Sequence, residues 1–143
     1  MFMGEFAHNI DRKGRLIMPA KFRDKLGERV IVNRGLDGCL NVYTTEQWEV
    51  VYKKIAALPS TNKDARMYQR IFLSKASEVD LDSQGRILIP LTLVNLAGLQ
   101  KECLIIGVAT HIEIWSKEKW EALEAEQSDS FEDFAENLSG LME

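Results

Sequence analysis

The stretch Asp11-Arg-Lys-Gly-Arg-Leu-Ile-Met-Pro19 returns further along the chain as Asp82-Ser-Gln-Gly-Arg-Ile-Leu-Ile-Pro90. Both copies place Asp, Gly, Arg and Pro at the same spacing, and three apolar residues separate Arg from Pro. The agreement continues where Leu40-Asn-Val-Tyr-Thr-Thr-Glu-Gln-Trp48 aligns with Ile112-Glu-Ile-Trp-Ser-Lys-Glu-Lys-Trp120. A repeated order of turn, strand, proline-led helix, strand and Trp-bearing helix indicates a tandem duplication.

Each copy predicts a tight turn between two strands. The side chains of Asp11 and Asp82 are placed to accept hydrogen bonds from backbone N–H groups of the turn. Gly14 and Gly85 supply the positive φ that such a turn needs. We therefore assign these four residues to shaping the two turns.

Short helices are expected after both turns. Pro19 and Pro90 suit the first helical turn, and Gly27 and Gly98 suit the end of a helix. The spacing leaves room for about two helical turns in each copy. Further helices are predicted after Thr44 and Ser116, over residues 62–73 and over residues 130–141. In the helix after Thr44, four side chains recur at helical spacing and are expected in the core: Trp48, Val51, Ile55 and Leu58.

The duplication defines the expected domain organisation. Residues 5–47 and 76–119 form the two repeated domains, residues 59–75 a helical linker, and residues 120–143 an acidic C-terminal helix. Each repeat of about 40 residues is too small to bury a good core alone. We expect the two to pack as an internal pseudo-dimer of the α+β class, mainly β, with short flanking helices.

Composition narrows the classes of protein. The chain of 143 residues is 45% apolar and 28% charged, which is ordinary for a folded protein. The longest charge-free stretch, residues 87–100, contains Pro and Gly and is too short to span a bilayer. Cys39 and Cys103 lack CxxC spacing, and no export signal is visible, so we expect reduced cytosolic thiols. A membrane protein, a disulfide scaffold and a zinc finger are thereby disfavoured.

The net charge of −4 conceals an asymmetry between the two halves. Residues 1–71 hold 13 Lys or Arg against 8 Asp or Glu, whereas residues 72–143 hold 5 against 14. This division suggests a basic working surface and an acidic remainder, although both are equally compatible with solvated faces of a stable domain.

A pseudo-twofold pair would bring both Asp-x-x-Gly-Arg turns toward one face. Arg15 and Arg86 keep their charge at any ordinary pH and fork onto phosphate oxygens or onto guanine O6 and N7. Arg12 and Lys13 add positive charge to the first turn, and Gln84 gives the second a hydrogen-bonding group. The alternative is that each Arg pairs with its own Asp as a structural lock, and the residues alone leave both interpretations open.

The turn sequence followed by apolar-x-apolar-Pro resembles the SpoVT-AbrB domain. Two such domains in this length, together with Arg34-Gly-Leu-Asp-Gly-Cys-Leu40 and the tail Ser130-Phe-Glu-Asp-Phe-Ala-Glu136, resemble the MraZ family of transcriptional regulators. The resemblance implies a double barrel of swapped β-hairpins, closed ring-shaped homo-oligomers, and a cytoplasmic, nucleoid-associated location. It also implies autoregulatory binding of double-stranded DNA at short direct repeats upstream of a division and cell-wall gene cluster. The DNA-binding signature falls on Asp11 with Arg15 and on Asp82 with Arg86, and the less basic Ser83-Gln84 sets the second turn apart.

The sequence gives less support to two other classes of function, an enzyme and a protein-binding module. An enzyme needs a nucleophile, a base or a metal site, and His8 and His111, the only histidines, show no metal-ligand spacing. No Gly-rich phosphate loop of known spacing occurs, so we predict no enzymatic activity, metal, cofactor, small-molecule substrate or membrane partner. The rival is a protein-binding module, as in antitoxins with this domain, whose acidic segment 118–143 would hold a basic partner.

Overall fold

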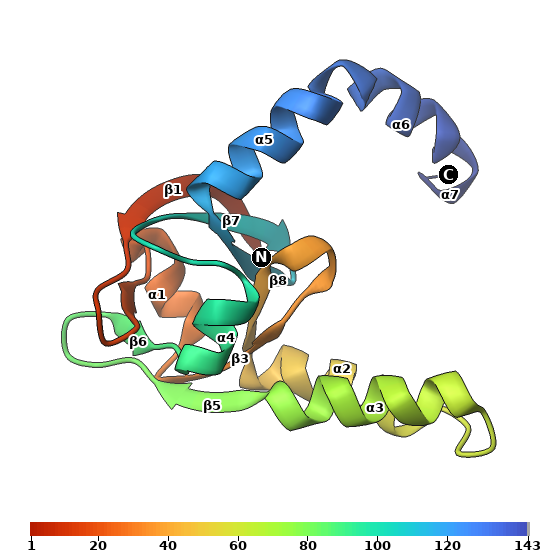
Figure 1. The fold of residues 1–143 in the computed structure, drawn as a ribbon, viewed down its shortest axis with the longest axis horizontal. Coiled ribbons are helices and arrows are strands. Elements are labelled where there is room, and N and C mark those ends of the chain that lie inside the picture. Colours follow the sequence, from red (N-terminus) through yellow and green to blue (C-terminus); the bar gives the residue numbers. More distant parts are fainter. Residues whose placement is uncertain (143) are drawn as a thin grey trace.

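Each repeat folds as two strands around a tight turn, then a short helix and two more strands. A computed structural model describes residues 1–142 of the chain (Figure 1). The first repeat supplies β1 (Phe2–Asn9), β2 (Arg15–Ile17), α1 (Ala20–Leu26), β3 (Arg29–Arg34), the 3-10 turn η1 (Leu36–Gly38) and β4 (Leu40–Thr44). The second supplies β5 (Ser77–Asp80), β6 (Arg86–Leu88), α4 (Leu91–Leu96), β7 (Glu102–Ala109) and β8 (His111–Ser116).

The strands of the two repeats alternate within shared sheets. One antiparallel sheet of six strands has the order β1-β7-β8-β4-β3-β5, and β2 pairs with β6 in a separate two-stranded ribbon. The counterparts of β1, β2, β3 and β4 in the second repeat are β5, β6, β7 and β8. When each strand is replaced by its counterpart, the order of the six-stranded sheet reads backwards and the β2–β6 pair stays the same, as expected for a pseudo-twofold axis. The chain is therefore an internal pseudo-dimer with swapped hairpins, which confirms the predicted α+β class.

The hairpins are also exchanged through the turns. The Ile89 N–H donates to the Gly14 carbonyl at 2.8 Å, and the Met18 N–H donates to the Gly85 carbonyl at 2.9 Å. Each turn thus bonds to the strand that follows the other turn. Neither repeat completes its backbone hydrogen bonds without its partner, so the two fold as one unit.

The core lies between the sheet and the ribbon and draws on both repeats. Side chains of the ribbon alternate, with Leu16 and Ile87 fully buried and Arg15 and Arg86 on the opposite face. The apolar runs at residues 30–32 and 104–106 lie within β3 and β7. The buried core cluster consists of Phe2, Ile10, Leu16, Met18, Phe22, Leu26, Val30, Val32, Leu40, Val42, Ile87, Ile89, Leu93, Ala97, Leu99, Cys103, Ile105, Ile112 and Ile114.

Short helices follow each turn, as expected, but Pro19 and Pro90 stand one residue before them. Their backbone is extended, with ψ of 138° and 139°, so they occupy the N-cap position rather than the first helical turn. Gly27 and Gly98 have positive φ at the helix ends, as predicted. The helices α1 and α4 span seven and six residues, which is about two turns.

Two helices form an arm that projects from the sheet. These are α2 (Thr45–Ala56) and α3 (Lys63–Lys75), seen at the lower right of Figure 1. Thr44 caps α2 by accepting from the Gln47 N–H at 3.1 Å. Trp48 stacks on Phe72 with ring centroids 5.8 Å apart, and the Gln69 side chain donates to the Ile55 carbonyl at 2.7 Å.

The apolar face of α2 is less buried than its sequence spacing predicts. The side chains of Trp48, Val51, Ile55 and Leu58 are half-buried, and α2 contains no fully buried residue. The expectation that they belong to the core is wrong for the single chain. Their spacing identifies the apolar face of the helix, but the sheet covers only part of that face.

The C-terminal segment is broken into several helices. The described part of residues 120–143, assigned above to one C-terminal helix, forms α5 (Lys117–Gln127), the 3-10 turn η2 (Ser128–Ser130), α6 (Phe131–Asn137) and α7 (Ser139–Met142). The helix expected after Ser116 is α5, and the one expected over residues 130–141 is divided between α6 and α7. Ser and Asp compete for backbone hydrogen bonds, which explains the break at Ser128-Asp129-Ser130. This second arm leads away from the sheet at the upper right of Figure 1. None of the helices within residues 1–142 is long and apolar enough to cross a bilayer.

Candidate nucleic-acid interface

The first turn is organised by one carboxylate. Asp11 Oδ1 accepts from the backbone N–H groups of Lys13 and Arg15, both at 2.9 Å. Its other oxygen, Oδ2, accepts from Arg15 Nε at 2.6 Å. The backbone N–H of Arg15 is the largest cause of a lowered Asp11 pKa; desolvation opposes it, and the Arg15 side chain and the Lys13 N–H lower the pKa further.

The second turn repeats this geometry. Asp82 Oδ1 accepts from the Gln84 and Arg86 N–H groups at 2.9 Å, and Oδ2 accepts from Arg86 Nε at 2.7 Å. The Arg86 N–H is again the main cause of a lowered Asp82 pKa. Gly14 and Gly85 have φ of 91° and 77°, a backbone conformation that glycine adopts without steric cost.

Both arginines form the ion pair that was the structural alternative, yet they remain accessible. The side chains of Arg15 and Arg86 are 37% and 30% exposed. Within residues 1–142, their side-chain hydrogen bonds use Nε alone, which leaves the two terminal NH₂ groups for a ligand. Each Asp therefore fixes the orientation of the guanidinium and leaves most of its N–H donors free to bind a ligand.

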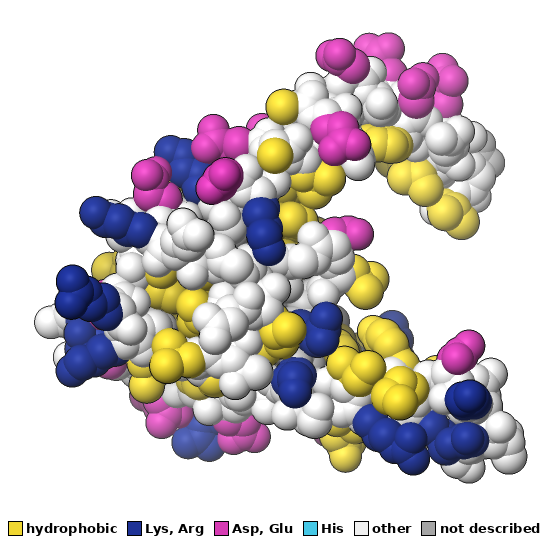
Figure 2. Space-filling model, in the orientation of Figure 1, with side chains coloured by type: hydrophobic (Ala, Val, Ile, Leu, Met, Phe, Trp, Pro, Cys, Tyr) yellow, Lys and Arg dark blue, Asp and Glu magenta, His cyan; other side chains and the backbone are white. Residues whose placement is uncertain are grey.

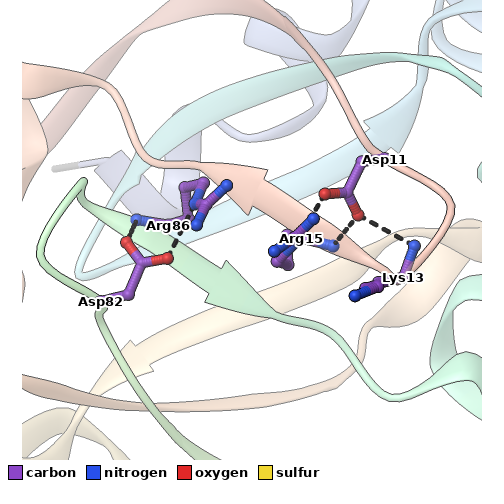
Figure 3. A network of polar contacts seen from close by, with 5 residues as sticks. All are labelled: Asp11, Lys13, Arg15, Asp82 and Arg86. Atoms are coloured by element: carbon purple, nitrogen blue, oxygen red, sulfur yellow. Dashed lines mark hydrogen bonds and ion pairs between the residues drawn. The ribbon is translucent and has the colours of Figure 1, made fainter.

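The ribbon places the two arginines on one face. Arg15 lies opposite Leu88 in the register, and Arg86 lies opposite Ile17. Residues directly opposite each other in a ladder point to the same side, and so do residues two positions apart on a strand. Figure 3 shows Arg15 and Arg86 on the adjacent strands β2 and β6, each beside the Asp of the turn that precedes its strand. The sheet topology thus brings together residues that are far apart in the sequence.

The two turns carry different charge. Residues 11–15 contain three cations and one carboxylate, whereas residues 82–86 contain one of each. Arg12, Lys13, Ser83 and Gln84 are all exposed at the turn tips. Figure 2 shows Lys and Arg side chains gathered at the end of the molecule where the β1–β2 and β5–β6 turns lie in Figure 1.

A further cation, Arg23, lies against the second turn and was missed in the sequence. Its Nε donates to the Met18 carbonyl at 2.9 Å, and its side chain covers the position where a Cβ on Gly85 would stand. Arg23 belongs to α1 of the first repeat but supplies positive charge beside the turn of the second. The repeat pattern could not reveal it, because its counterpart in the second repeat is Val94. The signal in the sequence was an Arg one turn into a helix led by Pro19.

The polar cluster around His111 lies apart from the face that carries Arg15 and Arg86. His111 lies 3.5 Å from Glu113 Oε2 and tilts against Tyr43, on the six-stranded sheet. The hydrogen bond from His111 is the main cause of a lowered Glu113 pKa. Across the described residues 1–142, no group of three His, Cys, Asp or Glu side chains is placed to hold a metal ion.

Comparison with known proteins identifies the family. The family model described as "MraZ protein, putative antitoxin-like" matches the chain twice, over residues 1–71 and 72–141. A transcriptional regulator MraZ of Ligilactobacillus salivarius is 52% identical over 138 residues, which cover 96% of each chain. A protein of the same name from Desulforamulus reducens is 53% identical over 142 residues, covering 99% of this chain and 100% of the relative. Two matches to one family model and full-length identity above one half show that the chain belongs to the MraZ family.

Proposed function

We propose that this chain is a DNA-binding transcriptional regulator that holds double-stranded DNA against the outer face of the β2–β6 ribbon and its two turns. The observation that carries the proposal is the placement of Arg15 and Arg86. Each is aimed by its own Asp, each keeps its terminal NH₂ groups accessible, and both lie on one face. The names of the relatives support a role in transcription.

In the proposed mechanism, Arg15 and Arg86 contact base edges or phosphates, and Gln84 donates to an adjacent group. Arg12 and Lys13 neutralise phosphates beside the first turn. Phosphate neutralisation releases counterions, so affinity falls with salt, with a logarithmic slope of about −0.9 for each phosphate engaged. A bidentate Arg–guanine contact adds roughly 1–3 kcal/mol of discrimination between bases.

The finer features of the proposal follow the family resemblance. The DNA site is a set of short direct repeats upstream of a division and cell-wall gene cluster, and the regulator acts on its own expression. A ring-shaped homo-oligomer in the cytoplasm, associated with the nucleoid, would engage successive repeats. Linking weak contacts raises the effective concentration at each site and gives avidity when the spacing matches. The proposal assigns no catalytic role and no cofactor to the chain.

The test is a footprint and a titration on DNA upstream of the chain's own gene at two salt concentrations. Arg15→Ala should abolish binding while the oligomer persists, and Arg12→Ala should reduce the salt slope by about 0.9. Lys117→Ala is the matched control, because it removes a cation that belongs to α5, not to the ribbon or its turns, and that pairs with Glu102 at 3.1 Å. Unchanged affinity of Arg15→Ala with an intact oligomer would remove this residue from the interface.

A further inference from the structure

The α2–α3 arm presents an uncovered apolar groove. The groove has a volume of about 490 Å³ and lies between α2, α3 and the loop at residues 34–39. Val51, Ile55, Tyr68 and Ile71 line it, and the last two are each 43% exposed. Exposed apolar side chains gathered in a groove indicate a site of macromolecular contact.

The C-terminal arm carries a matching apolar side. Phe131, Phe134, Leu138 and Leu141 are spaced three or four residues apart, as on one side of a helix. Their exposed fractions are 75%, 44%, 45% and 82%. The main packing partners of α6 are η2 and α7, so this side is not covered by the sheet. Figure 2 shows apolar side chains on the sides of the two arms that face the open space between them.

The charges of the two arms are complementary. Residues 45–75 contain six Lys or Arg and three Asp or Glu, whereas residues 117–143 contain nine Asp or Glu and two Lys. A basic helical hairpin with an apolar groove and an acidic helix with an apolar stripe fit the recognition of a helix in a groove. The opposite electrostatic potentials of the two arms favour contact between a basic arm and an acidic arm. They disfavour contact between two arms of the same charge.

We propose that the α6–α7 segment of one subunit docks, through Phe131, Phe134 and Leu138, into the α2–α3 groove of a second copy of this chain. The segment and the groove of one chain lie on separate arms (Figure 1), so the occupant comes from a neighbour. Each subunit then gives one segment and receives another. Such a head-to-tail contact closes into a ring when the rotation allows. The inference rests on the homo-oligomer proposed above and identifies its interface.

The experiment is a complementation between two defective full-length variants, with mass measured by light scattering on a sizing column. One variant carries Phe131→Asp with Phe134→Asp in the segment, and the other carries Ile71→Asp in the groove. Each alone should fall to the mass of a monomer. Co-expressed, they should form a dimer, because only the intact segment of the groove variant fits the intact groove of the segment variant.

Controls separate this inference from a folding defect and from the DNA-binding proposal. Met3→Asp is the matched control, because it also replaces an exposed apolar side chain by a charged one. Met3 lies on β1 with 81% of its surface exposed, and this variant should keep the wild-type mass. Circular dichroism should show the same unfolding midpoint for the monomeric forms of both defective variants. Arg15→Ala should keep the oligomer and lose DNA, so failure of the DNA proposal would leave the mass data unchanged.

Four results would overturn the inference. The wild-type chain could elute as a monomer, or both variants could keep its mass. The co-expressed pair could also remain monomeric, which would show that each segment folds onto its own groove or that the contact is symmetric. Stoichiometric capture of a basic protein by the wild-type segment, with no self-association, would assign the segment to another partner.

Discussion

Replacing Gly14 by alanine tests whether the turn of one repeat is held by the strand of the other. Gly14 has φ of 91°, and a Cβ built on it would stand 2.5 Å from the backbone carbonyl oxygen of Ile89. Gly38 is the matched control, since its φ is 90° and nothing lies within 4 Å of its Cβ position. Both substitutions put a side chain in the left-handed region, but only Gly14→Ala meets the second repeat.

The expected cost follows from these two contacts. Left-handed backbone costs an L-residue about 1–2 kcal/mol, which is the whole effect expected for Gly38→Ala. For Gly14→Ala the turn must also move by at least about 0.5 Å, because real Cβ contacts essentially never lie below 3.0 Å. That shift strains the bond from the Ile89 N–H to the Gly14 carbonyl, and overpacking of this kind costs about 1–3 kcal/mol. The free energy of unfolding should therefore fall by about 2–5 kcal/mol for Gly14→Ala.

Thermal unfolding at one fixed protein concentration measures the difference. At about 3–4 °C per kcal/mol for a chain of this length, the midpoint should fall by about 6–20 °C for Gly14→Ala and by about 3–8 °C for Gly38→Ala. Equal midpoints for the two variants would refute the cross-repeat contact at this turn. Urea unfolding of the same variants should give the same order of stability.

Three further predictions concern the core, the turns and the thiols. Leu16→Ala should lower the free energy of unfolding by about 2–5 kcal/mol in a urea titration, because Leu16 is fully buried between the repeats. The pKa values of Asp11 and Asp82 are lowered in the folded chain, so the two ionised carboxylates stabilise the fold at pH values above their unfolded pKa of about 3.9. This stabilisation is lost as the pH falls through the folded-state pKa values. The double Asp→Asn variant should therefore show a shallower loss of stability in acid than the wild type. Burial raises the pKa of Cys39 to about 12 and that of Cys103 to about 11, so a disulfide reagent at pH 8 should label them only on unfolding, and rapid labelling of the native chain would contradict this.

The local features were predictable because a few residues determine them. Asp11 and Gly14 dictate a turn whose hydrogen bonds close within five residues, and recurrence at Asp82 and Gly85 shows that the unit is duplicated. The pairing of β1 with β7, by contrast, joins strands about 100 residues apart, and no local pattern specifies it. The swapped arrangement followed from the family resemblance together with the argument that one repeat cannot bury a core.

The misses share a physical cause. Helical spacing identifies the apolar face of α2 but not what covers it, so Trp48 and its neighbours were assigned to the core although the single chain leaves them half-buried. Arg23 was missed because its role depends on a turn of the other repeat, which lies beside it only after folding. The domain boundaries at residues 5–47 and 76–119 stay predictions, whereas the duplication itself is confirmed by the two family matches.

Fusion of the two copies in one chain allows the two turns to differ, which a dimer of identical chains cannot do. The first turn has Arg12 and Lys13 where the second has Ser83 and Gln84. The backbone of the ribbon is symmetric, but the turn at one end carries more positive charge than the turn at the other. DNA lying across the ribbon would therefore be held more strongly at the end with the first turn. Symmetric dimers suit palindromic sites, because the twofold axis of the protein matches that of the DNA. Subunits with two unlike turns, arranged head to tail, would instead present their turns to the DNA in the same orientation from one subunit to the next. Direct repeats require this arrangement, because each repeat has the same direction along the DNA.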